Sequence, residues 1–322
     1  MGAARERGKG RSFMEAERKR RSGDVRTILL ADMAMLVIAV FWGSGFGVSS
    51  WLLKTISPMW LLAVRFTLSA LFLACVLWRR MAALDRKQMV LAGGLGVFLG
   101  FVFFAHIFGL QLTTAGKQSF IAGSNVAMVP FLYALFYRRW PGAVATVAAL
   151  LTTTGLLIMA FTPSMAWGMG DGLSLLLALG IALHVLIVGN LSRRMDPVGL
   201  TGVQMAATAV FLVLAAALFE PMPHFGGLSP KIWGGVVYVA LCVTAIPFLV
   251  QNMAQRYSPE THAAILLSLE SPFGYVIAIL LGQEVLNAQV VLGGVVILSG
   301  VLLAESEPFL RRFFSRAEVT GG

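Results

Sequence analysis

Charged residues are scarce in this chain of 322 residues: they make up 12%, against about a quarter in an average soluble domain. Apolar residues make up 58%, and the mean hydropathy is +0.82. A soluble globule of this size could not shield so much apolar surface from water. The composition therefore excludes a soluble enzyme, a nucleic-acid-binding domain and a disordered chain, and it predicts an all-α integral membrane protein.

Cysteine, metal-binding patterns and nucleotide-binding patterns are missing as well. The two cysteines, Cys75 and Cys242, lie in apolar runs and support neither a disulfide nor a zinc site. No Gly-x-x-x-x-Gly-Lys-Ser/Thr motif occurs, and no polar segment is long enough for an ATPase domain. Gly-x-Ser-x-Gly, Asp-x-Asp and His-Glu-x-x-His motifs are also absent. We therefore expect no cofactor, no metal and no ATP-driven step, and an intramembrane transferase is disfavoured.

Ten apolar runs approach or exceed the length of about 20 helical residues that crosses a bilayer core. Several of these runs are separated by a dipeptide of a polar residue and a proline: Ser57-Pro58, Asp196-Pro197 and Ser258-Pro259. The expected transmembrane helices cover residues 29–52, 59–78, 89–110, 118–137, 143–161, 172–191, 199–218, 232–252, 261–281 and 289–304.

The formal net charge of +10 follows the expected topology. Nine of the 25 Lys and Arg residues lie within the first 26 residues, and most of the others lie between apolar runs. With the N-terminus in the cytosol, ten helices place 21 of them on the cytosolic side and leave Lys54, Lys117 and Lys231 on the other side. This bias predicts a multi-pass protein of the inner membrane with both termini in the cytosol. Its basic face would contact anionic lipid headgroups, and no nucleic-acid partner is expected.

The two halves of the chain contain a weak internal repeat. Residues 33–72 align without gaps with residues 172–211 at an offset of 139, so that Pro58 meets Pro197. Further along, Pro130 meets Pro272 at an offset of 142. A single match is weak evidence in so apolar a chain, but several matches in the same order favour a repeat over coincidence.

A repeat of five helices would insert its second copy upside down, because five is odd. Inverted repeats are a recurring plan of secondary transporters, whose substrate site lies near the bilayer midplane between the repeats. The expected organisation is a basic cytosolic tail (1–27), a first five-helix repeat (28–161), a second five-helix repeat (172–304) and a cytosolic C-terminal tail (305–322).

Three short motifs resemble a known group of transporters. They are Phe41-Trp42-Gly43-Ser44-Gly45-Phe46, Ser57-Pro58 with the following Leu61–Phe66 segment, and Ser268-Leu269-Glu270-Ser271-Pro272-Phe273. In this order the sequence resembles the EamA branch of the drug/metabolite transporter superfamily over about residues 29–304. The proline after Glu270 comes one position later than in that pattern, and the basic tail is no part of it. The resemblance implies export of small metabolites, amino acids or drugs, without fixing the substrate.

Glu270 and Arg65 are ionisable residues inside predicted helices. Glu270 lies about nine residues, or about 14 Å, into its run and therefore near the midplane. An ionisable group there costs roughly 3 kcal/mol and usually faces a cavity or a partner. Glu270 is predicted to accept a proton or to bind a substrate ammonium; the alternative is a carboxyl that only holds helices together. Arg65 either pairs with a substrate carboxylate or an acidic neighbour or snorkels to the outer headgroups. Its repeat mate is Gln204, which is polar but uncharged and is predicted to share a binding role.

Other polar side chains within the runs complete the predicted substrate-binding or proton-coupling set. His106 and His184 are candidate proton relays, with simple hydrogen bonding to a neighbour as the alternative. The rest either line a polar cavity or satisfy backbone groups freed by nearby prolines. They are Trp42, Asn125, Gln251, Asn252 and Tyr275.

Two acidic residues receive no functional role from the sequence. Asp32, in the first turn of its run, is expected to favour the helix dipole. Asp171 is expected in a loop.

The combined prediction is a secondary transporter that exports small metabolites, with amino acids or related compounds foremost, by proton coupling or facilitated diffusion. A multidrug or organic-cation exporter is the nearest alternative. An intramembrane transferase and a non-transporting membrane scaffold are alternatives of a different class. The expected partners are a small-molecule substrate and the lipid bilayer, and a homodimer is left open.

Overall fold

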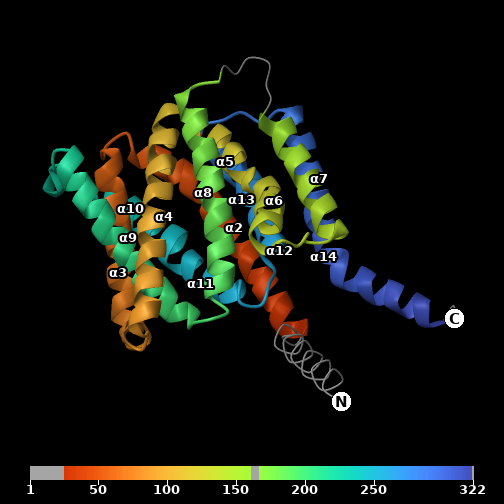
Figure 1. The fold of residues 1–322 in the computed structure, drawn as a ribbon. Helices are drawn as coiled ribbons and strands as arrows, with labels where there is room; N and C mark the ends of the chain where they lie inside the picture. The colour runs from red at the N-terminus through yellow and green to blue at the C-terminus, as the bar shows by residue number, and fades with distance from the viewer. Residues whose placement is uncertain (1–24, 161–166, 321–322) are drawn as a thin grey trace.

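The computed structural model describes residues 25–160 and 167–320, which form a bundle of helices (Figure 1). Eight helical spans in these ranges are long and apolar enough to cross a membrane, and two shorter apolar helices cover Ala143–Met159 and Ala288–Ala304. No strand occurs within these ranges. The helical segments begin and end within a few residues of the ten expected apolar runs, apart from the last one.

Seven helices are continuous, and local sequence signals set several of their ends. Pro58 and Pro197 begin two of them, because a proline at the first helical position gives up no hydrogen bond. Asp85 and Gln88 form a capping box at the start of a third. The last helix continues well into the segment that was expected to be a C-terminal tail. These helices are α2 (Val25–Leu52), α3 (Pro58–Ala82), α4 (Arg86–Leu112), α7 (Ala143–Ala160), α8 (Met169–Leu191), α9 (Pro197–Phe219) and α14 (Ala288–Thr320).

Two spans are broken in the middle. Ser124 separates α5 (Ala115–Gly123) from α6 (Asn125–Tyr137), and Ser268 and Leu269 separate α12 (Glu260–Leu267) from α13 (Glu270–Leu280). At each break the serine Oγ donates a 2.6 Å hydrogen bond to the carbonyl three residues earlier. Such side-chain bonds compete with the helical ladder, which explains why both breaks contain serine.

A third span changes its helical pitch. It starts as α10 (Pro230–Ala240), becomes the π-helical turn η2 (Leu241–Ala245) and ends as α11 (Ile246–Ala254). Pro247 has no N–H to offer the carbonyl of Val243, so the normal ladder is interrupted there. The short 3-10 helix η1 (Phe225–Gly227) lies in the connection that precedes this span.

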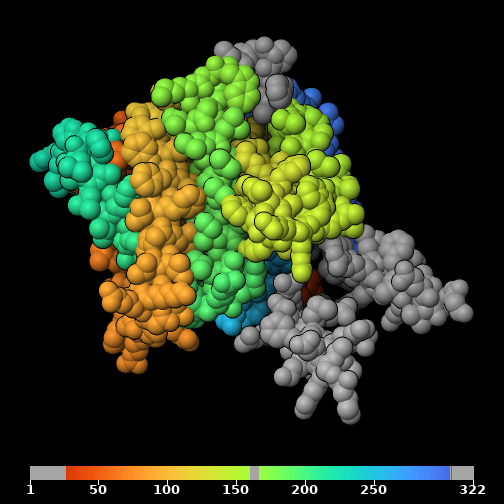
Figure 2. Space-filling view, in the orientation of Figure 1, coloured from red at the N-terminus to blue at the C-terminus, as the bar shows by residue number. Residues whose placement is uncertain are grey.

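The helices pack in pairs that join the two halves of the chain. The closest packing is of α3 against α9 and of α7 against α14, and α2 lies against α13. Figure 2 shows α8 between α4 and the α6–α7 segment across one face of the molecule. Many large apolar side chains are exposed on the outside, among them Leu135 and Leu218 at 70% and 78%. This apolar exterior suits contact with lipid, while the polar side chains described next lie inside.

Candidate functional site

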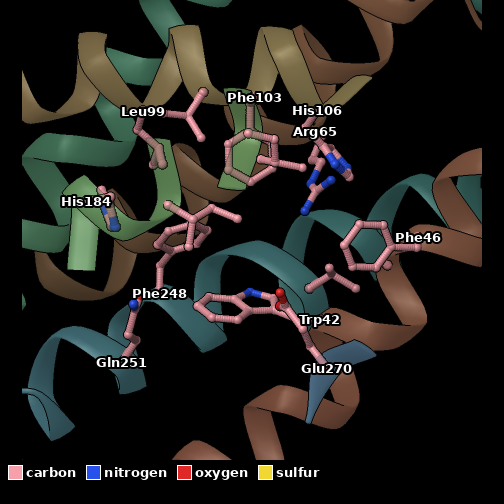
Figure 3. Close-up of a pocket in the computed structure, with 15 residues that line it drawn as sticks. Trp42, Phe46, Arg65, Leu99, Phe103, His106, His184, Phe248, Gln251 and Glu270 are labelled. Atoms are coloured by element: carbon pink, nitrogen blue, oxygen red, sulfur yellow. The ribbon is translucent and has the colours of Figure 1, made fainter. Parts of the chain in front are cut away.

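A cavity of about 70 Å³ lies inside the bundle and has room for several water molecules. Seven elements contribute to its wall: α2, α3, α4, α8, η2, α11 and α13. Most of the lining is apolar or aromatic, and five side chains bring charge or an amide or imidazole group (Figure 3). The lining residues are Trp42, Gly45, Phe46, Arg65, Leu99, Val102, Phe103, His106, Leu177, Ile181, His184, Val243, Phe248, Gln251 and Glu270.

Arg65 is the positive charge of the cavity. It is 3% exposed, and its Nε donates a 2.6 Å hydrogen bond to Oγ1 of Thr244 on η2. The guanidinium carbon lies 5.0 Å from the centre of the Phe103 ring, within the range of a cation–π interaction. Within residues 25–160 and 167–320 no carboxylate oxygen lies within 4.0 Å of the Arg65 side-chain nitrogens. Arg65 is therefore buried facing the cavity and does not snorkel to the surface.

Glu270 is the only carboxyl group among the residues that line the cavity, and it is the first residue of α13. It is 6% exposed, and in the described part of the chain its carboxylate forms neither an ion pair nor a hydrogen bond. Gly43 lets α2 approach closely here, since a Cβ at that position would lie 2.6 Å from the backbone oxygen of Glu270. Arg65 and Glu270 thus face one space from different helices without pairing with each other (Figure 3).

The two histidines line the same cavity but differ in their partners. The His106 ring stands edge-on to Phe46 and Phe103, at centroid distances of 5.4 and 5.5 Å. Nε2 of His184 lies 2.8 Å from Nε2 of Gln204, where the amide donates and the imidazole accepts. Both imidazoles therefore have aromatic neighbours, since the His184 ring stands edge-on to Phe248 at 5.7 Å, but only the His184 ring also belongs to a polar network among the described residues.

That network continues behind the cavity wall. Nδ2 of Asn252 donates to Oε1 of Gln204 at 3.3 Å and to Oγ1 of Thr201 at 2.9 Å. Gln204 and Asn252 are fully buried and hold α9 against α11, but neither lines the cavity. Their contact with the cavity runs through His184.

Two predicted site residues lie away from the cavity. Nδ2 of Asn125 donates to the carbonyl of Ala122 at 2.9 Å, across the break between α5 and α6. The hydroxyl of Tyr275 donates to the carbonyl of Val285 at 2.8 Å, and its ring stacks on Phe120. Of the ten predicted residues, six share the cavity: Trp42, Arg65, His106, His184, Gln251 and Glu270.

Ion pairs near the ends of the bundle were missed by the sequence analysis. Asp171 does not lie in a loop as expected; it lies in the first turn of α8, 2% exposed, with Oδ2 2.7 Å from Nζ of Lys117. Asp32 does more than favour a helix dipole, because its Oδ2 lies 3.4 Å from Nε2 of His262. Arg193 pairs with Glu260 beside that second pair. Each partner is distant in sequence, so only the fold brings the charges together.

The structure offers no cluster for a metal ion: among the described residues no three His, Cys, Asp or Glu side chains converge. The chemistry available in the cavity is therefore that of one guanidinium, one carboxyl, two imidazoles and an amide, set among aromatic and aliphatic side chains.

Comparisons with known proteins agree with this architecture. The model of the EamA-like transporter family matches the chain twice, over residues 29–161 and 168–305. An uncharacterized transporter of Archaeoglobus fulgidus is 27% identical over 265 residues, which are 80% of each chain. A WAT1-related chloroplastic protein of Arabidopsis thaliana is 27% identical over 192 residues, 56% of this chain and 46% of its own length. A crystal structure of another protein shares the fold with a TM-score of 0.70 at 16% identity, over 88% of this chain and 98% of that one.

Proposed function

Because the chain belongs to the EamA-like transporter family and is a multi-pass membrane transporter, we propose that it is a secondary exporter of amino acids or closely related metabolites. The observation that carries this proposal is that one cavity contains a guanidinium and a carboxyl group, neither of which has an ionic partner within the described residues. Arg65 and Glu270 are both buried, and each lacks an ionic partner within the described residues. A buried charge without a partner is costly, so such a pair favours a ligand that brings both missing charges.

An amino acid has the required chemistry. Its carboxylate matches the guanidinium of Arg65, which can bind two oxygens at once, and its ammonium matches the carboxylate of Glu270. The aromatic and aliphatic lining from Trp42, Phe46 and Phe248 would surround the side chain of the substrate. Glu270 would also exchange a proton when the cavity is empty, and this exchange would couple transport to a proton gradient.

The transport mechanism that we propose uses two inverted repeats of five transmembrane helices, residues 28–161 and 172–304. The double match to the family model and the serine-containing breaks in α5–α6 and α12–α13 support a repeat. Ser69 of α3 donates across to a carbonyl of α10 at 2.7 Å, and Thr208 of α9 donates across to a carbonyl of α4 at 2.8 Å. Residues 69 and 208 are separated by the repeat offset of 139. Discontinuous helices and a central site between repeats are typical of alternating-access transporters.

The ion pairs support the same arrangement. Asp32 and Asp171 are separated by the offset of 139, and their partners His262 and Lys117 are both the third residue of a half-helix, α12 and α5. The proposed location is the inner membrane with both termini in the cytosol. The distribution of Lys and Arg supports this topology, and so does the position of the first residues of α2 and the last residues of α14 at the same end of the bundle (Figure 1).

An organic-cation exporter is the second candidate. A carboxylate beside Trp42 and other aromatic rings is a suitable environment for a cation. The positive charge of Arg65 in the same cavity weighs against it, because a simple cation leaves that charge unpaired. An amino acid and its decarboxylated amine therefore distinguish the two candidates.

The experiment is a flux assay with the purified protein in liposomes. We expect efflux of at least one labelled amino acid from a panel of all twenty, faster with an imposed pH gradient, and slow flux of the corresponding amine. Preferred transport of the amine would favour the organic-cation exporter, and no flux of any amino acid would contradict the main proposal.

Glu270→Gln tests the coupling role. The amide cannot exchange a proton, so we expect the stimulation by the pH gradient to be lost while the protein stays monodisperse and keeps its unfolding temperature. Glu220→Gln is the matched control, because that carboxylate accepts hydrogen bonds from the N–H of Met59, away from the cavity. Flux through Glu270→Gln that still responds fully to the gradient would reject the role.

A further inference from the structure

We propose that Thr244, on the π-helical turn η2, is a positioning residue that fixes the guanidinium of Arg65 so that only its outer edge is available to a substrate carboxylate. The inference rests on the proposed function, and it concerns a residue that does not line the cavity itself. Its basis is the number and direction of the hydrogen bonds around Thr244 and Arg65.

The direction of the bonds follows from the chemistry of the hydroxyl. Oγ1 of Thr244 lies 2.8 Å from the carbonyl oxygen of Val239, which can only accept. The single hydroxyl proton is therefore donated to Val239, and the lone pairs of Oγ1 face the Nε–H of Arg65 at 2.6 Å. Thr244 is thus a fixed acceptor for one of the five N–H donors of the guanidinium.

Two aromatic rings also lie close to the guanidinium. Its central carbon lies 5.0 Å from the centroid of Phe103 and 5.8 Å from that of Phe66. The two terminal nitrogens carry the remaining four N–H donors, and within the described ranges they have no protein acceptor. They present the parallel fork that binds both oxygens of a carboxylate. Because Nε is occupied, a carboxylate can approach along the terminal edge only.

The π-helical turn explains why a threonine can do this. Ile246 N–H bonds the carbonyl of Leu241, five residues back, since Pro247 interrupts the ordinary ladder. The wider turn brings Oγ1 of Thr244 within reach of both Val239, five residues back, and Arg65 on α3. Single π-helical turns inside α-helices are frequent at functional sites. Ser69, one turn after Arg65, locks the register by donating to the carbonyl of Ala240 at 2.7 Å.

The test is the concentration dependence of flux in proteoliposomes for Thr244→Val and Thr244→Ser. The probes are the amino acid that the wild type transports fastest and the amine that lacks its carboxyl group. Valine keeps the shape but removes the acceptor, so we expect the KM for the amino acid to rise about tenfold or more with little change in the maximal rate. We expect the KM for the amine to stay the same. Serine keeps the hydroxyl and should restore the KM to within about twofold.

Thr208→Val is the matched control. Thr208 is also a fully buried threonine that bonds a helix carbonyl across the bundle, but it does not contact Arg65. It should leave the KM unchanged. A drop in maximal rate and stability shared by Thr244→Val and Thr208→Val, without a specific rise in KM, would mean that Thr244 has only a structural role and would overturn the proposal.

Arg65→Gln separates this proposal from the proposed function. If the wild type transports an amino acid and Arg65→Gln abolishes saturable flux while Thr244→Val behaves as wild type, the function stands and the positioning role of Thr244 fails. If the wild type transports amines rather than amino acids, the substrate proposal fails first. A specific KM effect in Thr244→Val that serine rescues is the result that supports the positioning role.

Discussion

Some residues separated by the offset of 139 have similar contacts and others differ, and α3 and α9 show this most clearly. The hydroxyls of Ser69 and Thr208 each lie within hydrogen-bond distance of the carbonyl four residues earlier and of a carbonyl on the neighbouring span, so that one proton is shared between two acceptors. Those earlier residues are Arg65 and Gln204. Arg65 faces the cavity, whereas Gln204 points into a network with His184 and Asn252. The two residues that join helices are both hydroxyl residues, whereas the residues one turn earlier differ in charge and in surroundings.

The buried carboxylates Asp171 and Asp32, at the two ends of the bundle, have partners of different chemistry. Asp171 begins α8 and pairs with Lys117. Arg193 follows the other end of α8 and contacts Glu260, two residues before His262, which pairs with Asp32. The partner is a lysine at one end and at the other a histidine, a residue type that can be neutral or charged near pH 7. The two carboxylates should therefore differ in how much the fold depends on them.

The largest expected effect is the loss of stability in Asp171→Asn. The substitution removes the charge that neutralises the buried Lys117, and breaking such a pair costs about 3–5 kcal/mol. Asp32→Asn should cost much less, since a histidine partner can be neutral and, in the part of the chain that the structure describes, Oδ1 of Asp32 has no hydrogen-bond partner. Unfolding temperature in detergent, measured for both variants, checks the order.

The control for this comparison is the double variant Asp171→Asn with Lys117→Gln. It removes both charges and should recover most of the stability lost by Asp171→Asn alone. Equal losses in Asp171→Asn and Asp32→Asn would show that the two ends are equivalent in energy and would contradict the comparison.

An intermediate effect on stability is expected from a substitution at Gly43. The residue 139 positions later is Ala182. Alanine is tolerated at 182, but at 43 its Cβ would lie 2.6 Å from the oxygen of Glu270 and 2.7 Å from the nitrogen of Gly274. Both are backbone atoms, so α13 must move away from α2. We expect Gly43→Ala to cost about 1–3 kcal/mol and to slow transport by displacing Glu270.

Gly94→Ala provides the reference for Gly43→Ala. Among the described residues, no atom outside the adjoining backbone of α4 lies within 4 Å of a Cβ built at Gly94, so alanine there should be neutral or slightly stabilising. Thermal unfolding and flux of both variants give the result. A Gly43→Ala protein as stable and as active as Gly94→Ala would mean that the close approach of α2 and α13 has no role.

The helices were predictable from the sequence because each apolar run is bounded by proline, glycine or charge. The interruptions at Ser124, at Leu241–Ala245 and at Ser268 were not predicted, because a few polar residues within an apolar run do not by themselves show that the helix breaks. Which ladder bond is replaced by a side-chain or longer-range bond depends on the neighbouring helices. The end of α14 also differs, because residues that are too polar for a membrane span can still continue a helix.

The candidate site could be predicted where burial alone makes a side chain conspicuous. Glu270, Arg65 and the two histidines stand out in apolar runs, and all of them line the cavity. Thr244 was missed because a threonine is common in a transmembrane helix and its importance depends on a contact 179 positions away in the chain. The partner of Lys117 was missed for the same reason. Pairing between distant helices is a property of the packing, which composition and spacing do not encode.

The smallest expected effect tests whether the hydrogen bonds of the Ser69 and Thr208 hydroxyls to neighbouring helices contribute equally to the free energy of unfolding. Ser69→Ala and Thr208→Ala each remove one hydroxyl that bridges two carbonyls, so each should lower the free energy of unfolding by about 1 kcal/mol. Ser69 connects α3 with α10, and Thr208 connects α9 with α4. Because these are different helix pairs, the two losses of free energy should add in the double variant. Reversible unfolding in detergent, followed by circular dichroism, measures all three changes. If Ser69→Ala lowered the free energy of unfolding far more than Thr208→Ala, the hydrogen bonds of Ser69 beside Arg65 would contribute more to stability than those of Thr208. The two halves would then differ in the contacts between their helices as well as in their cavity-facing residues.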